Sequence, residues 1–243
     1  MPTGTVEMIL NYGDPIVHLE PGGVQSLPRF YVSGQRTRAV HPFVGGRVGL
    51  LVVSLYPWAL RELFPGCVGA LDCYADLEQL VVRSRLEAFV ELFDAAVDEA
   101  GRTHAAFALL EQLASDASDA RVPMVRAAVQ RLVHDAGRTR VSELAEAFGV
   151  SGRHFTRRFR AQVGLAPKHF ARVMRFQRAL RHCRAGTQGL AQIATHCGYV
   201  DQSHMSHELL ELGGRTPSEI VERARADNSV LGAGSTIFEC VYL

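Results

Sequence analysis

The chain has 243 residues, a formal net charge of +1 and 47% hydrophobic residues. This composition supports one large or two ordinary folded domains and excludes disorder as a global state. No apolar run reaches the roughly 18 residues of a membrane span, and no basic start followed by an apolar stretch marks a secretion signal. The 5 cysteines follow no metal or disulfide spacing. We therefore expect a cytoplasmic protein with buried thiols, no membrane partner, no metal and no other cofactor.

Charge is distributed unevenly along the chain. Residues 1–120 carry 8 Arg and 15 Asp or Glu, whereas residues 121–226 carry 18 Lys or Arg and 8 acids. An acidic half joined to a basic half is typical of a polyanion-binding module beside a module with another role. The alternative is a chance distribution of surface charge.

Residues 1–119 are expected to form a mixed β/α regulatory or dimerisation domain. Its predicted strands, bounded by Gly and Pro, are Val6–Leu10, Ile16–Leu19, Arg29–Gly34 and Val48–Tyr56. We expect the second strand to be a short partner of the first. Val48–Tyr56 is the most apolar strand, so we expect it in the centre of the sheet.

Helices are predicted after the strands. Pro57 opens a short helix that continues to Leu63, and apolar residues recur at helical spacing over 77–97 and again over 107–113. The 77–97 segment could form a helix–helix dimer or cover the sheet. The polar stretch Ser115–Asp119 is the predicted domain boundary.

Four aromatic residues of this half could line an apolar pocket, but we expect them to pack in the core, as aromatic side chains commonly do. They are Tyr31, Phe43, Tyr56 and Trp58. His18 and His41 have no His-x-His partner and no Glu at ligand spacing, so no metal site is predicted.

Residues 120–226 are predicted to form an all-α domain of seven helices. Pro123 and Pro167 lie at first-turn positions of the first and fourth helices. Ser142 and Ser151 are the predicted N-caps of the second and third helices, and Asp201 or its neighbour is the predicted N-cap of the sixth. The third helix is expected to bury Phe155 and Phe159 and to end at Gly164, and the seventh is expected to start at Thr216–Glu219.

A short pattern occurs twice in this half. Leu144 and Ile193, Ala145 and Ala194, and Gly149 and Gly198 are each separated by 49 residues. A large apolar residue, then a small one, then a Gly four residues later suits two helices that cross closely at a tight turn. The repeat predicts two helix-turn-helix units whose recognition helices enter successive major grooves of DNA.

Residues 122–225 resemble the AraC/XylS-type transcription regulators. The most specific pieces are Gly198–Met205, Gly213–Pro217 and the link Gly164–Pro167. Residues 11–15, 32–35 and Arg38 resemble the mixed β/α regulatory domain of a subset of that family. The resemblance implies an α+β protein that regulates transcription, more often as an activator. Its implied partners are double-stranded DNA, a small-molecule effector, RNA polymerase and a second copy of the chain.

The resemblance also implies which side chains of the third helix face DNA. Arg153, Thr156 and Arg157 are expected to contact base edges, since Arg can donate two hydrogen bonds to guanine O6 and N7. Arg158 and Arg160, together with the helix start at Ser151, are expected to contact phosphates. The alternative is a solvated basic face without a role in recognition.

The sixth helix is expected to contribute less. Gln202, Ser203 and His207 match positions that face the groove, and the helix start at Asp201 can present backbone N–H groups to a phosphate. Glu208 and Glu211 are expected to repel phosphates, so the second unit is predicted to bind weakly. Some of the five arginines of the connecting helix could contact phosphate, but each is expected first to pair with acids or to be solvated, namely Arg172, Arg175, Arg178, Arg181 and Arg184.

Two other functions were weighed. A DNA alkyl-group acceptor, found fused to this module in some relatives, needs a reactive Cys, and His182-Cys183-Arg184 is only a superficial match that lacks the preceding Pro. An enzyme in the β-domain is not supported by any triad, phosphate loop or carboxylate pair, so no catalytic residue is predicted. Residues 227–243 form a tail, in which Ser235–Leu243 is predicted to be a strand that returns to the N-terminal domain.

Overall fold

The computed structural model describes residues 1–20, 23–40, 42–67, 71–116 and 123–230. They fall into two compact units. The β/α unit contains the described residues of 5–35 and 40–116, and the helical unit contains 123–230 together with 1–4 and 36–39. The predicted boundary at 119/120 and the predicted strand Ser235–Leu243 lie outside the described residues.

The β/α unit contains two antiparallel sheets. A four-stranded sheet has the order β6-β1-β4-β7, and a three-stranded sheet has the order β3-β2-β5. The strands are β1 (Val6–Asn11), β2 (Ile16–Glu20), β3 (Gly23–Ser26), β4 (Phe30–Ser33), β5 (Pro42–Val44), β6 (Leu50–Leu55) and β7 (Tyr74–Asp76).

Two expectations about strand pairing are wrong. The most apolar strand, β6, lies at an edge of its sheet, whereas β1 is central because it pairs with both β4 and β6. β2 does not pair with β1 but with β3 and β5. The apolar composition of a strand indicates which of its faces are buried. It does not determine whether the strand pairs with one neighbour or with two.

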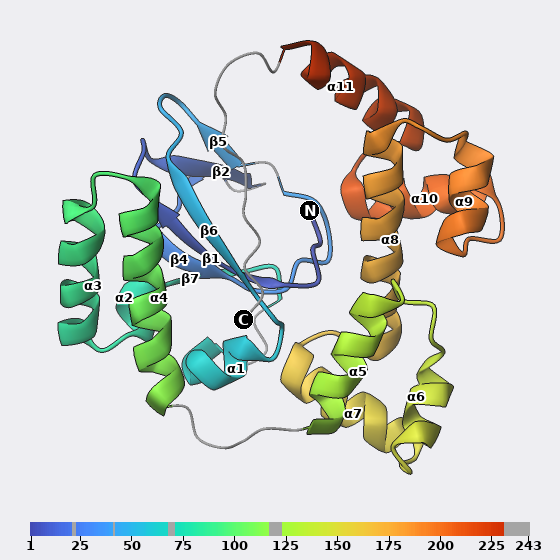
Figure 1. Ribbon diagram of the computed structural model, residues 1–243, viewed down its shortest axis with the longest axis horizontal. Coiled ribbons are helices and arrows are strands. Elements are labelled where there is room, and N and C mark those ends of the chain that lie inside the picture. Colours follow the sequence, from blue (N-terminus) through green and yellow to red (C-terminus); the bar gives the residue numbers. More distant parts are fainter. Residues whose placement is uncertain (21–22, 41, 68–70, 117–122, 231–243) are drawn as a thin grey trace. The chain divides into compact units, whose positions relative to one another are not determined.

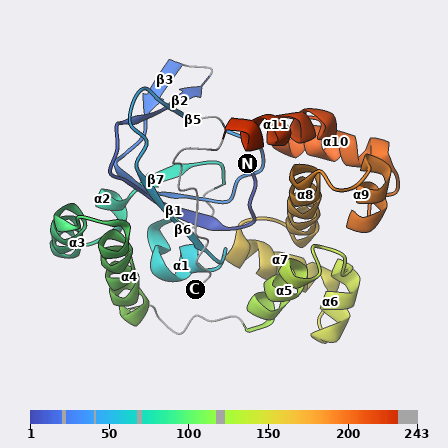
Figure 2. The ribbon, with the colours of Figure 1, turned by 45° about the horizontal axis from the view of Figure 1, so that its top comes forward.

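Helices cover one face of the four-stranded sheet (Figures 1 and 2). They are α1 (Ala59–Leu63), α2 (Leu77–Leu80), α3 (Arg83–Ala95) and α4 (Glu99–Asp116), with a 3₁₀ turn at Pro65–Cys67. Phe89 and Phe93 of α3 each lie 5.3 Å from the ring of Phe30 on β4, in the same core as Met8 and Leu10 of β1. The predicted helical segment over 77–97 is divided into two helices, because Val81 is extended and Val82 is the non-helical N-cap of α3.

Three of the four aromatic residues behave as expected. Trp58 and Tyr31 are buried, and the Tyr56 ring stacks on Trp58 at 4.3 Å. The prediction for Phe43 is wrong, since its side chain is 60% exposed on β5, an edge strand. The described residues contain no group of three or more potential metal ligands, and His41 lies outside them.

The helical unit confirms the predicted seven helices. They are α5 (Pro123–His134), α6 (Val141–Ala147), α7 (Gly152–Val163), α8 (Pro167–Ala185), α9 (Leu190–Cys197), α10 (Gln202–Gly213) and α11 (Pro217–Val230). α8 connects two groups, with α5 to α7 at one end and α9 to α11 at the other (Figures 1 and 2). No helix in the described ranges is both long and apolar enough to cross a bilayer.

Local hydrogen bonds set the starts of these helices. Ser151 Oγ accepts the N–H of His154 at 3.3 Å, and Asp201 Oδ1 accepts the N–H of His204 at 2.7 Å, so both are N-caps as predicted. The cap predicted at Ser142 is wrong. α6 starts two residues earlier than that cap implies, because the Glu143 carboxylate accepts the N–H of Arg140 at 3.3 Å, which makes Arg140 the N-cap.

Each group of helices has its own core. In the first, the ring of Phe159 lies 5.8 Å from Phe155 and 5.7 Å from Phe170 of α8. In the second, Ile193 of α9 and Met205 of α10 pack in one buried cluster with Phe176 of α8. Burying side chains of this size stabilises the fold by about 1.5–3 kcal/mol each. Both cores therefore depend on α8, which fixes one group to the other.

Candidate nucleic-acid interface

The structure confirms that the repeated pattern forms two helix-turn-helix units, α6–α7 and α9–α10. Gly149 and Gly198 follow the first helix of each unit with φ of 63° and 81°, a left-handed conformation that glycine adopts without a steric penalty. The Leu144 and Ile193 side chains and their small neighbours are buried at the helix crossings. Each unit thus presents its second helix, α7 or α10, as a recognition helix.

α7 has one buried and one exposed face. Phe155 and Phe159 are 0% exposed, whereas Arg153 and Arg157 are exposed and Thr156 is half-buried. An open groove of about 690 Å³ follows the exposed face, lined by Gly152, Arg153, Thr156, Arg157, Arg160 and Ala161. The three side chains predicted to contact bases therefore share one groove.

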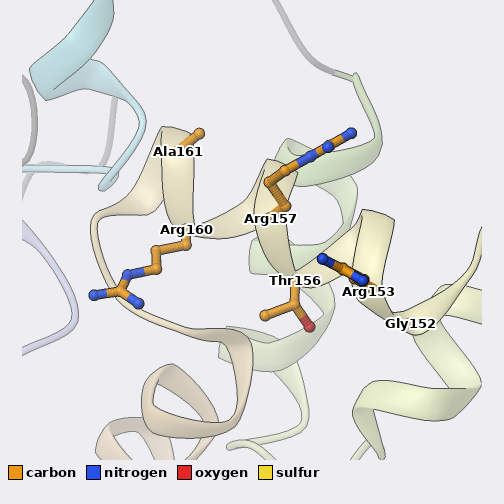
Figure 3. Close-up of a pocket in the computed structure, with 6 residues that line it drawn as sticks. All are labelled: Gly152, Arg153, Thr156, Arg157, Arg160 and Ala161. Atoms are coloured by element: carbon orange, nitrogen blue, oxygen red, sulfur yellow. The ribbon is translucent and has the colours of Figure 1, made fainter.

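Figure 3 shows how these side chains lie. Arg153 and Thr156 are beside each other, while Arg157 and Arg160 extend in opposite directions. Arg157 Nη2 lies 3.4 Å from Nδ1 of His154, one turn earlier on the helix. Arg160, predicted to contact phosphate, lines the same groove, and Arg158 is exposed outside the groove lining.

The positive charge of α7 is not neutralised by carboxylates of the described residues. Among the described residues no carboxylate forms an ion pair with Arg153, Arg157, Arg158 or Arg160. Guanidinium groups without carboxylate partners keep their donors available for phosphate and for guanine. This face of α7 can therefore bind a polyanion without first breaking an ion pair.

The second recognition helix presents fewer charges. Gln202, Ser203 and His207 are exposed on α10, as is the capping residue Asp201. None of these side chains is an arginine or lysine, so base contacts from α10 rest on neutral or weakly basic groups.

The N-caps of the two units identify a candidate DNA contact that was not predicted from the sequence. The glycines of the two units are 49 residues apart, but the N-caps Ser151 and Asp201 are 50 apart, because the second turn is one residue longer. Counted from the caps, Thr156 corresponds to Ser206. Ser206 Oγ donates to the Gln202 carbonyl at 2.9 Å, which holds the hydroxyl on the helix. Matching the caps rather than the glycines would have found this residue.

The expected repulsion by Glu208 is wrong. Its side chain is 4% exposed and points toward α8, where its oxygens accept from Arg172 Nε at 2.9 Å and from Arg175 Nη2 at 3.0 Å. Glu211 pairs with Arg172 Nη2 at 2.7 Å. Both carboxylates are thus neutralised by α8, and Glu208 ties α10 to it.

This network explains the shifted pKa values nearby. Burial would raise the pKa of Glu208, but hydrogen bonds from Arg175 and Arg172 outweigh burial and hold that pKa below its ordinary value. Burial and the adjacent Glu208 raise the pKa of Tyr199, whose ring lies 4.8 Å from the guanidinium carbon of Arg175. The ordinary protonation states at neutral pH are therefore an ionised Glu208 and a neutral Tyr199.

Comparisons with known proteins agree with this geometry. The model of a family described as "Helix-turn-helix domain" matches residues 144–223, which include both units and α8. The C-terminal region is an AraC-type helix-turn-helix domain. The HTH-type transcriptional regulator Rv1931c of Mycobacterium tuberculosis is 31% identical to the chain over 83 residues, which cover 34% of the chain. The chain spans 32% of the length of that curated relative.

Solved structures resemble the chain at the level of fold. ToxT from Vibrio cholerae O395 bound to (E)-4-(8-methylnaphthalen-1-yl)but-3-enoic acid matches over 92% of each chain, with a TM-score of 0.51 and 9% identity. A transcriptional regulator from Chromobacterium violaceum, with an AraC-type DNA-binding domain, matches 42% of this chain and 92% of its own, with a TM-score of 0.39 and 23% identity. The ToxT likeness extends over both the β/α unit and the AraC-type domain.

Proposed function

We propose that the protein is a sequence-specific DNA-binding transcription regulator in which α7 supplies most of the base recognition. The observation that carries the proposal is the groove along α7 in an AraC-type domain, where no carboxylate of the described ranges pairs with Arg153 or Arg157. A bidentate Arg–guanine contact contributes about 1–3 kcal/mol of discrimination against the wrong base.

The proposed complex uses two adjacent major grooves. α7 and α10 both pack on α8, whose 19 residues rise by roughly 28 Å along the helix axis. One turn of B-DNA is about 34–36 Å, so recognition helices attached to one helix of this length suit successive grooves. In this arrangement α10 contributes through Gln202, Ser203, Ser206 and His207, and the helix starts at Ser151 and Asp201 lie against phosphates.

The burial of Cys183 disfavours its use as an alkyl acceptor. Cys183 is 0% exposed, and burial together with the neighbouring Cys197 raises the pKa of its thiol to about 11. The thiolate is the nucleophile in alkyl transfer, and about one Cys183 in 10⁴ would be ionised at neutral pH. A buried thiol of this kind suits packing rather than catalysis.

We further propose that the β/α unit modulates DNA binding in response to a small-molecule effector. The support is the likeness of fold to ToxT, whose structure contains a bound organic acid. Contact with RNA polymerase and homodimerisation remain predictions of the family resemblance.

The test is selection of bound duplexes from random DNA by the full-length protein, repeated with the Arg153→Ala/Arg157→Ala variant. The proposal predicts an enriched motif for the natural protein and loss of preference at one or two positions for the variant. Arg83→Ala, which changes an exposed arginine of the β/α unit, is the matched control and should enrich the same motif. Failure of the natural protein to enrich any motif would overturn the proposal.

A further inference from the structure

The arginines of α8 form two groups with different surroundings. Arg172 and Arg175, in the first half of the helix, are neutralised by Glu208 and Glu211. In the part of the chain that the structure describes, no carboxylate forms an ion pair with Arg178 or Arg181, in the second half. The arginines in the two halves of α8 therefore differ in their pairing with carboxylates, and those of the second half need a separate explanation.

Three segments bring basic groups together beside this second half. Arg178, Arg181 and His182 are spaced i, i+3 and i+4, which places them on one face of α8. His196 near the end of α9 faces them, since its Nε2 lies 2.9 Å from Arg178 Nη2 and its ring centroid is 4.8 Å from that of His182. Arg138, in the turn between α5 and α6, donates to the carbonyl oxygen of His196. We name Arg138, Arg178, Arg181, His182 and His196 the cationic cluster.

The cluster members influence one another electrostatically. Burial, then His196, Arg178 and Arg181, lower the pKa of His182, so each proton added there meets positive charge. Like charges held this close are unfavourable in the free protein unless an anion balances them. Arg138, Arg181 and His196 are exposed, so a balancing anion can reach them from solvent.

The position of the cluster indicates which anion it binds. Arg138 precedes α6 of the first helix-turn-helix unit, and His196 lies in the last turn of α9 of the second, so the cluster lies where the two units meet. A duplex that spans both recognition helices exposes its sugar–phosphate backbone between the two major grooves. Guanidinium groups bind phosphate through paired hydrogen bonds, which a cluster of three arginines can supply.

We infer that the cationic cluster binds the DNA backbone between the two grooves, with Arg138, Arg178 and Arg181 as phosphate ligands. The inference rests on the proposed function, because it assumes a duplex across both units. Such contacts fix the register of the protein on DNA without selecting sequence, and they compensate for the absence of arginine and lysine among the candidate contacts on α10. They add a third point of attachment to those of α7 and α10.

The test measures the affinity of full-length protein for a selected duplex and for a scrambled duplex of equal length, over a range of salt concentrations. Arg138→Gln and Arg181→Gln should each reduce the slope of log K against log salt by about 0.9 and weaken binding about fivefold at 0.15 M salt. The double variant should weaken binding roughly thirtyfold, equally for both duplexes. Arg184→Gln removes the same charge from an exposed arginine one turn beyond Arg181 and should leave the slope unchanged.

Uncharged phosphate analogues identify which phosphates of the duplex the cationic cluster contacts. Replacing single phosphates between the two grooves by methylphosphonates should weaken the natural protein more than the Arg138→Gln/Arg181→Gln variant, in which Arg178 is the one remaining phosphate ligand of the cluster. An unchanged salt slope in Arg181→Gln, or a loss of affinity in Arg184→Gln equal to that in Arg181→Gln, would overturn the inference. If the natural protein still prefers the selected duplex, the proposed function stays intact. Equal affinity of the natural protein for selected and scrambled duplexes would instead contradict the proposed function.

Discussion

Replacement of Glu208 by alanine tests whether the buried ion network fixes the second recognition helix. Glu208 is 4% exposed and bonds two arginines of α8, while those arginines keep 28% and 22% of their side-chain surface in contact with water. Removing one partner of a buried ion pair costs about 3–5 kcal/mol. Because Arg172 retains Glu211 and both arginines reach solvent, we expect a loss of about 2–4 kcal/mol in the free energy of unfolding.

The assay is urea denaturation of the full-length protein, followed by circular dichroism at 222 nm. Glu211→Ala is the matched control, since it removes a carboxylate of the same helix that is 63% exposed and pairs with Arg172 alone. An exposed pair of this kind contributes up to about 1 kcal/mol. If the two variants lose the same stability, the buried network does not hold α10, and our argument from burial is wrong.

Three further predictions address recognition, the turn and pH. Arg157→Ala should weaken binding to a selected duplex by about 1–3 kcal/mol and relax one base position, whereas Arg160→Ala should weaken all sequences alike, as measured by competition binding. Gly198→Ala should cost about 1–2 kcal/mol of stability in urea denaturation, because φ is 81° and no atom lies within 4 Å of an added Cβ, so the penalty is one of backbone conformation alone. The low pKa of Glu208 contributes stability that is present above the unfolded value of about 4.3 and lost as the pH falls through the folded value. The natural protein should therefore lose more stability than Glu208→Gln between pH 6 and pH 3.

Local features of the chain predicted the helices well, because the information lies within a few residues. The caps at Ser151 and Asp201 and the left-handed glycine at 198 depend on hydrogen bonds and φ values that neighbouring residues determine. The N-cap predicted at Ser142 is wrong by only two residues, because the Glu143 carboxylate accepts the N–H of Arg140 and Arg140 becomes the N-cap.

Contacts between distant residues could not be predicted in the same way. Glu208 meets Arg175 across 33 residues, and Arg138 meets His196 across 58, so periodicity gave no indication of either pair. The position of β6 at a sheet edge is a similar case, because strand order depends on pairing partners that apolar composition does not encode. The candidate contacts on α7 are predicted from the family resemblance, and their spacing of i, i+3 and i+4 agrees with a single exposed face of one helix.

Recognition of guanine by the arginines of α7 is the central claim, and methylation interference tests it most directly. A duplex selected by the full-length protein is methylated sparsely at guanine N7, and the bound and free fractions are compared for the natural protein and for Arg153→Ala/Arg157→Ala. The account predicts that methylation at one or two guanines in a single major groove blocks the natural protein and no longer affects the variant. Interference at the same guanines with the same strength in both proteins would contradict it.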